Sequence, residues 1–191
     1  MGVSSAAPAS YCVSVIGGAI TNRTLRDTAM SFIDFETTGL SARSGARVVE
    51  VSIVRVEPDG EPQVVLDTLI DPEGPVLCTS IHGIDDEDVL GAPRFTDILG
   101  EMIGALENSV VAAFNASFDI SFLTAEARLA PNTSKLRTPP YICLMWMRPL
   151  LGLSKRCSLE AACHQHGLRA GTHRAAEDAL ACAYMWKHYL D

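Results

Sequence analysis

Hydrophobic residues near the start of the chain are concentrated in three segments that have the pattern of β-strands. Residues 29–35 form an apolar run that ends in acidic residues and the turn-prone sequence Thr-Thr-Gly. Residues 48–57, V-V-E-V-S-I-V-R-V-E, are rich in β-branched residues, and residues 63–70 follow after the turn sequence Pro-Asp-Gly. These short connections predict an antiparallel meander of three strands.

The rest of the chain alternates between helical and strand patterns. Wholly apolar residues 110–114 predict a buried strand, and residues 141–145 predict a fifth strand. Five segments read as helices: residues 85–90, 95–106, 118–129, 158–166 and 175–188. A meander followed by further strands and helices predicts the α/β class, with a mixed sheet covered by helices.

Length and composition predict one folded domain. The chain has 191 residues, of which 48% are hydrophobic and 20% are charged, without an internal repeat or a linker. We assign residues 29–191 to the domain and residues 1–28 to an N-terminal extension that is partly disordered or forms a short extra strand. The N-terminus lacks the pattern of a signal peptide, and no run of eighteen apolar residues occurs, so we expect a cytoplasmic protein without membrane contact.

Basic residues are concentrated in one part of a chain whose net charge is −8. Between positions 135 and 174 the only acidic residue is Glu160, against the basic residues Lys135, Arg137, Arg148, Lys155, Arg156, Arg169 and Arg174. A basic segment of this kind suits contact with nucleic-acid phosphates, and a solvated surface with a chance excess of charge is the alternative.

Cysteine and histidine occur close together at Cys157, Cys163, His164 and His166. Their spacing matches no standard zinc site, and the segment has a helical pattern, so we interpret them as buried cysteines and surface histidines. The sequence has no C-x-x-C pair, and a disulfide framework is not expected at this length.

Two acidic residues end the first predicted strand. Asp34 and Glu36 are two positions apart, so their side chains lie on the same face of the strand. Carboxylate pairs of this kind are typical ligands of Mg²⁺ and Mn²⁺, although a solvated strand end explains an isolated D-x-E equally well.

Further acidic residues follow two other predicted elements. Asp119 lies just beyond the buried strand 110–114, and Asp178 lies in the last helix, five residues after His173. The carboxyl ends of parallel strands meet at one edge of a sheet, so these separate segments can reach a common cleft.

Five motifs together resemble a known family. They are D-F-E-T-T-G from Asp34, I-H-G-I from Ile81, A-P-R-F from Ala92, N-A-S-F-D from Asn115 and H-R-A-A-E-D from His173. In this order they resemble the DEDD exonucleases, in the subgroup whose third motif carries histidine, and most of all its branch of epsilon proofreading subunits of bacterial DNA polymerase III. The resemblance extends from about Phe32 to Trp186.

This resemblance implies a ribonuclease-H-like fold with five strands in the order 3-2-1-4-5. It implies two divalent cations, Mg²⁺ or Mn²⁺, held by four carboxylates: Asp34, Glu36, Asp119 and Asp178. It also implies that His173 is the general base that accepts a proton from the attacking water, a role suited to a side chain that titrates near neutral pH.

Several other residues are candidates for substrate contact. They are Thr37, Thr38, Gly39, His82, Asn115, Phe118 and Arg174. For three of them a structural role is an open alternative: a turn histidine at position 82, a capping residue at 115 and a core phenylalanine at 118. The chain also departs from many relatives, which have a histidine where Phe114 stands.

The implied activity is the metal-dependent removal of nucleoside monophosphates from nucleic-acid 3′ ends. We expect single-stranded DNA as the substrate and a DNA polymerase as a potential partner. An RNA-directed exonuclease similar to oligoribonuclease or ribonuclease T is the first alternative. A non-catalytic nucleic-acid-binding module is the second, and it predicts the loss of one or more ligands. Because the chain ends soon after its last motif, we expect a free-standing enzyme or a partner bound without a tail.

Overall fold

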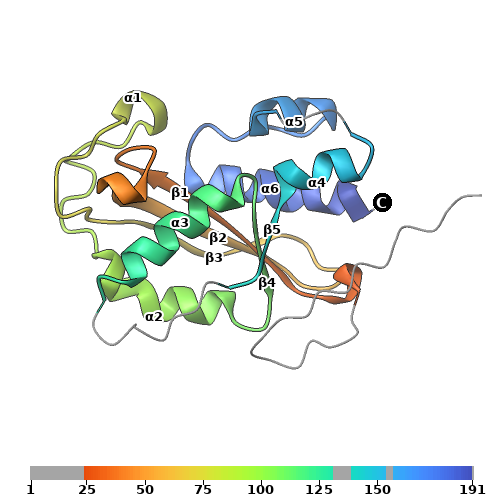
Figure 1. Cartoon of the computed structure of the whole chain (residues 1–191), viewed down its shortest axis with the longest axis horizontal. Helices are drawn as coiled ribbons and strands as arrows, with labels where there is room; N and C mark the ends of the chain where they lie inside the picture. Colours follow the sequence, from red (N-terminus) through yellow and green to blue (C-terminus); the bar gives the residue numbers. More distant parts are fainter. Residues whose placement is uncertain (1–23, 131–138, 154–156, 191) are drawn as a thin grey trace, which may run out of the picture.

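The structure is a computed structural model that describes residues 24–130, 139–153 and 157–190. Its centre is a five-stranded sheet in the order β3-β2-β1-β4-β5 (Figure 1). The strands are β1 (Met30–Thr37), β2 (Val48–Val56), β3 (Gln63–Leu69), β4 (Val110–Ala113) and β5 (Tyr141–Cys143). The first three are antiparallel, whereas β4 and β5 run parallel to β1. The predicted fold class and strand order are confirmed.

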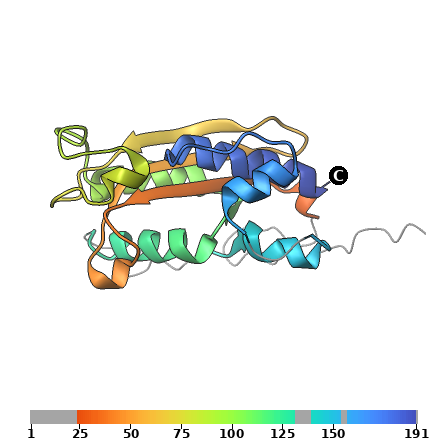
Figure 2. The same ribbon diagram turned by 90° about the horizontal axis from the view of Figure 1, so that it is seen from above.

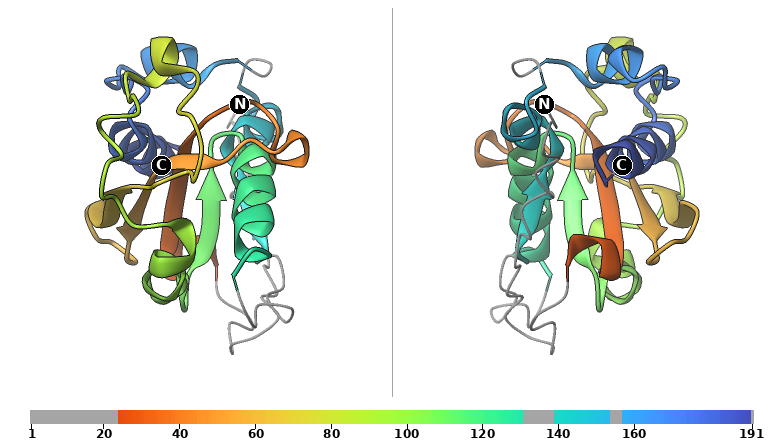
Figure 3. Two further views of the ribbon diagram at one scale, coloured as in Figure 1. Left: turned by 90° about the vertical axis from the view of Figure 1, so that its left-hand side faces the viewer. Right: turned by 90° about the vertical axis from the view of Figure 1, so that its right-hand side faces the viewer.

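Helices cover both faces of this sheet. They are α1 (Thr79–His82), α2 (Phe95–Leu106), α3 (Ala116–Ala127), α4 (Leu144–Leu150), α5 (Leu159–Gln165) and α6 (Ala175–Leu190), with 3-10 helices η1 (Leu25–Asp27) and η2 (Ala42–Ser44). Side chains along β1 point alternately to the two faces of the sheet. Ile33 packs in a core with α2 and α3, and Phe32 packs in a core with α4, α5 and α6. Figures 2 and 3 show β1 between α3 and α6.

Two predictions of local structure are wrong. The short helix lies at α1, and residues 86–91 form turns. The Asp85 carboxylate accepts hydrogen bonds from the N–H groups of Glu87 and Asp88, as at a helix start, but Gly91 with a φ of 79° ends the segment after these turns. The fifth strand ends at Cys143, and α4 follows it directly. Sequence patterns missed α4, which contains Pro149 in its last turn.

Part of the predicted basic segment is not available to nucleic acid. Arg148 is fully buried, and its guanidinium donates to the Tyr189 hydroxyl at 3.2 Å and to the Gln165 side-chain oxygen. A phosphate contact by Arg148 is therefore excluded. Positions 135, 137, 155 and 156 and most of the N-terminal extension lie outside the described residues. No helix in the described part of the chain is long and apolar enough to cross a membrane.

Candidate active site

The end of β1 places two carboxylates on the face covered by α6. Met30 and Phe32 point to this face, and the Phe32 ring lies 6.3 Å from the Trp186 ring of α6. Since side chains alternate along a strand, Asp34 and Glu36 continue the same row beyond the packed part. These two carboxylates form the end of the row and lie beside the start of α6.

Two helix starts bring the other carboxylates to this point. Asp178 lies in the first turn of α6, and one oxygen each from Asp34, Glu36 and Asp178 fall within 4.8 Å of one another. Asp119 lies in the first turn of α3, is 4% exposed, and is close enough to Asp34 for its charge to raise the pKa of that residue. The pairing of β1 with β4 ends at Phe32, which leaves room for this carboxylate beside β1. Three of the four predicted ligands therefore meet at one point, and Asp119 lies near enough to raise the pKa of Asp34.

Burial and mutual repulsion make these carboxylates hard to ionise together. Burial, followed by the charge of Asp178, raises the pKa of Glu36 to about 8. Burial raises the pKa of Asp119 to about 7 and that of Asp178 to about 6. The pKa of Asp34 is raised well above its ordinary value by burial and by Asp119. Such a cluster requires protons or cations for neutrality, and an all-oxygen donor set fits Mg²⁺ or Mn²⁺.

His173 lies in the loop that leads into α6. It is exposed, its charge lowers the pKa of Asp178, and its backbone has a φ of 58°. A positive φ is uncommon for a residue with a side chain, so the surrounding contacts must hold this conformation. Thr172 supports the loop by donating to Glu177 at 2.7 Å. Gly171 lies against Asp178, and a Cβ at this position would fall 1.7 Å from the Asp178 carboxylate.

Glu50 is a fifth carboxylate at this site, and the sequence patterns did not identify it. It lies opposite Glu36 in the pairing of β1 with β2 and is 3% exposed. Its carboxylate accepts hydrogen bonds from Arg174 and from the Ala175 backbone N–H. The only available signal was an acidic residue within the otherwise apolar sequence V-V-E-V, which is unusual because buried charges need partners.

The Thr-Thr-Gly segment forms an ordered turn beside the carboxylates. Thr37 donates to the carbonyl of Gly39 at 2.8 Å, and the Thr38 hydroxyl accepts from the Arg47 backbone N–H at 2.9 Å. The thiol of Cys78, which precedes α1, lies 3.7 Å from the Thr38 carbonyl. This contact places α1 against the turn, which directly follows Glu36.

The predicted contact residue His82 is buried in the turn of α1. Its Nδ1 accepts from the Ile84 backbone N–H at 3.1 Å, and its Nε2 lies 3.1 Å from the Leu77 carbonyl. The acceptor role of Nδ1 requires the proton on Nε2, which then donates to Leu77. Both ring nitrogens are thus occupied within the turn, which favours the structural alternative for this residue.

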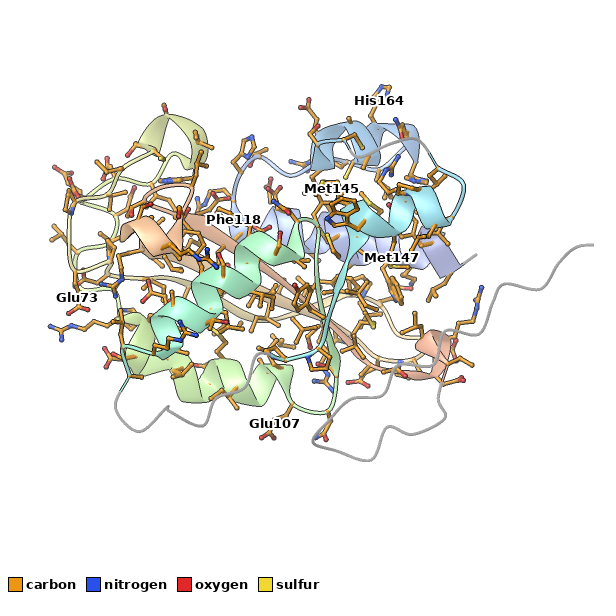
Figure 4. All side chains as sticks on the ribbon, viewed as in Figure 1. Glu73, Glu107, Phe118, Met145, Met147 and His164 are labelled. Carbon is orange, nitrogen blue, oxygen red and sulfur yellow. The ribbon has the colours of Figure 1, made fainter. Side chains whose placement is uncertain are left out.

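Two further candidates lie at the start of α3. Asn115 is the exposed N-cap residue, and its side-chain oxygen accepts from the Ser117 hydroxyl at 3.2 Å. Phe118, labelled on α3 in Figure 4, is half-buried. Its ring lies 4.8 Å from that of Phe122. Phe114, at the position where many relatives have histidine, is 8% exposed. Phe118 therefore packs partly against the core, in line with its structural alternative, and is not fully buried.

Comparisons with known sequences identify the family. A family model described as "RNase_T: Exonuclease" matches residues 31–186, and the chain belongs to this family, in the DEDD branch with histidine. The DNA polymerase III subunit epsilon of Treponema pallidum is 32% identical over 162 residues, which cover 81% of this chain and 73% of that protein. The PolC-type DNA polymerase III of Thermotoga petrophila is 29% identical over 189 residues, 95% of this chain. The chain spans only 14% of the length of that polymerase.

Solved structures agree on the fold. The nuclease domain of a 3′-exonuclease, described as a DEDDh family member bound to rAMP, has a TM-score of 0.70 at 19% identity, covering 85% of this chain and 91% of that one. Escherichia coli exonuclease I in a complex with single-stranded DNA has a TM-score of 0.65 at 18% identity, covering 84% of this chain and 40% of that one. At these identities the likeness establishes the ribonuclease-H-like architecture alone.

Proposed function

We propose that this chain is a metal-dependent 3′→5′ exonuclease that hydrolyses the terminal phosphodiester bond of single-stranded DNA and releases nucleoside monophosphates. The observation that carries the proposal is the convergence of four carboxylates from β1, α3 and α6 beside an exposed histidine. All four carboxylates and the histidine of the family motifs are present in the sequence, which argues against a non-catalytic binding module.

Asp34, Glu36, Asp119 and Asp178 would hold two divalent cations. When bound, such cations neutralise the charge that develops on the phosphate oxygens and promote water as the nucleophile. His173 takes the proton of the attacking water, because its exposed position beside Asp178 lets it meet both solvent and the scissile phosphate. The carboxylates themselves do not need to move protons during hydrolysis.

The terminal nucleotide lies over the Thr-Thr-Gly turn and α1, which are in contact with each other. Two large apolar side chains in this region are exposed, Leu40 by 85% and Ile81 by 52%. Apolar surface of this kind suits the faces of a nucleobase, and Phe118 offers a ring for stacking. The backbone of the turn, including Gly39, can approach the sugar and phosphate closely.

DNA is proposed because the sequence relatives include subunits and domains of DNA polymerase III. A DNA polymerase is the corresponding partner. The competing substrate is RNA, because nothing among the carboxylates or His173 distinguishes the two sugars.

Direct comparison of the two nucleic acids tests the substrate. Single-stranded DNA and RNA of identical sequence are digested with Mn²⁺, and kcat/KM is compared. A DNA enzyme gives the higher value for DNA, whereas a clear preference for RNA would assign the chain to the RNA-directed alternative. A primer with a 3′ mismatch, measured beside its matched control, tests for a proofreading preference.

A further inference from the structure

Glu50 is a buried charge beside the active site that the proposed chemistry does not use. It lies on β2 directly opposite Glu36, with 4% of its side chain exposed. Its negative charge raises the pKa of Asp34, Glu36 and Asp178. A buried carboxylate that only added repulsion to this cluster would destabilise the fold. The hydrogen-bond donors around Glu50 offset this cost.

Those partners are two consecutive residues at the start of α6. The Nε of Arg174 lies 3.0 Å from Oε1 of Glu50, and Nη2 lies 2.5 Å from the same oxygen. The backbone N–H of Ala175 donates to Oε2 at 2.9 Å. One carboxylate thus holds both the side chain of Arg174 and the first N–H group of the helix, where a negative charge is also favourable to the helix dipole.

The position of this contact in the sequence links it to the chemistry. Arg174 immediately follows His173, and Asp178 lies in the helical turn that Ala175 begins. His173 has a left-handed backbone conformation that needs support from its neighbours. The contact holds residues 174 and 175 against β2. It therefore fixes the orientation of His173 and the start of the helical turn that contains Asp178.

We propose that Glu50 and Arg174 are a pair of positioning residues that fixes the His173 loop and the first turn of α6, so that the pair acts through His173 and Asp178. This inference rests on the proposed role of His173 as the base. It replaces the expectation that Arg174 contacts a substrate phosphate. A phosphate contact and a positioning pair differ in what they do to substrate binding, salt dependence and turnover.

The test uses Arg174→Ala, Glu50→Gln and the double variant, assayed on single-stranded DNA at saturating Mn²⁺ and several salt concentrations. We expect Arg174→Ala to lower kcat on the order of 10- to 100-fold, the scale of a misplaced catalytic group, with KM within about twofold of the wild type. The salt dependence of KM should not change. The double variant should have a kcat no lower than that of Arg174→Ala, because either single change already disables the pair.

Lys187→Ala is the matched control. Lys187 pairs with Glu61 at 2.6 Å and so ties the other end of α6 to the turn before β3. Its removal breaks an ion pair of the same helix far from the carboxylates, and kcat should stay at the wild-type value. Thermal melting of each variant confirms that it is folded at the assay temperature.

Other results would overturn the proposal. A raised KM with a weaker salt dependence in Arg174→Ala would show a phosphate contact, as would losses that multiply in the double variant. If Arg174→Ala does not fold, Glu50→Gln carries the test, and wild-type kcat in that variant contradicts the pair. Failure of the proposed role of His173 as the base has a separate signature. In that case His173→Ala would keep the wild-type turnover, whatever the effect of Arg174→Ala.

Discussion

Replacing Glu36 by glutamine should stabilise the metal-free protein and destabilise the metal-loaded protein relative to the wild type. Glu36 has a pKa of about 8, raised from 4.5 by burial and by Asp178. Because the pKa of Glu36 is higher in the folded than in the unfolded state, ionisation of this residue destabilises the folded protein. This destabilisation is absent below about pH 4.5 and grows as the pH rises towards 8. Glutamine keeps the shape of the side chain and removes this charge.

The size of the effect follows from the shift. One pKa unit corresponds to about 1.4 kcal/mol, so the penalty at neutral pH is at most about 3 kcal/mol. Solvent screens the part-exposed edge of Glu36, which reduces the penalty to roughly 1–2 kcal/mol. For a chain of this length the corresponding rise in Tm is roughly 3–6 °C. Bound Mn²⁺ at 100 times its Kd stabilises the wild type by about 2.7 kcal/mol. The variant lacks a ligand, and a 100-fold weaker Kd would lower its gain to about 0.4 kcal/mol, which is enough to reverse the order.

Thermal melting with chelator and with Mn²⁺, at pH 5 and near pH 8, checks this prediction. Without metal the variant should melt above the wild type at the higher pH, with little difference at pH 5, and Mn²⁺ should reverse the order. Glu101→Gln, at an exposed position of α2, is the control and should change Tm little in all conditions. A Glu36→Gln variant that melts at or below the wild-type temperature without metal would refute the account of a repulsive, metal-requiring cluster.

Three more predictions concern activity. His173→Ala and His173→Gln should each lower kcat on the order of 10²- to 10⁴-fold while substrate and Mn²⁺ affinity stay close to wild type, whereas lost metal affinity would make His173 a ligand. Excess chelator should abolish hydrolysis and added Mn²⁺ restore it, and activity that persists in chelator would exclude the proposed metal chemistry. Leu40→Ala and Ile81→Ala should raise KM several-fold with little change in kcat, and an unchanged KM in both would remove them from the nucleotide contact.

The sequence predicted the sheet well because its strands carry strong local signals. Residues 48–57 are rich in β-branched residues, and the four carboxylates lie in motifs whose order is typical of the family. The short helices were harder, because the Asp85 side chain bonds to the backbone in the same way at a helix start and in a turn, and α4 contains a proline. Local propensity does not encode such choices.

Contacts between residues far apart in the sequence could not be predicted from sequence patterns. Arg174 and Glu50 are separated by 124 positions, so no spacing rule connects them, and the sequence motif alone suggests only a substrate contact for Arg174. Likewise, Arg148 looked available to phosphate because its charge was visible and its burial was not. Folding brings each arginine to its hydrogen-bond partner, and the sequence alone does not show that partner.

The most direct test of the central claim is the polarity of digestion. Single-stranded DNA labelled at its 5′ end is incubated with Mn²⁺ and the wild type or Asp178→Asn, and the products are separated by length. The account predicts that the wild type gives a ladder of labelled strands shortened one nucleotide at a time from the 3′ end, together with nucleoside monophosphates, and that Asp178→Asn gives almost none. Immediate release of the label as a mononucleotide, internal cleavage, or an equal ladder from Asp178→Asn would contradict it.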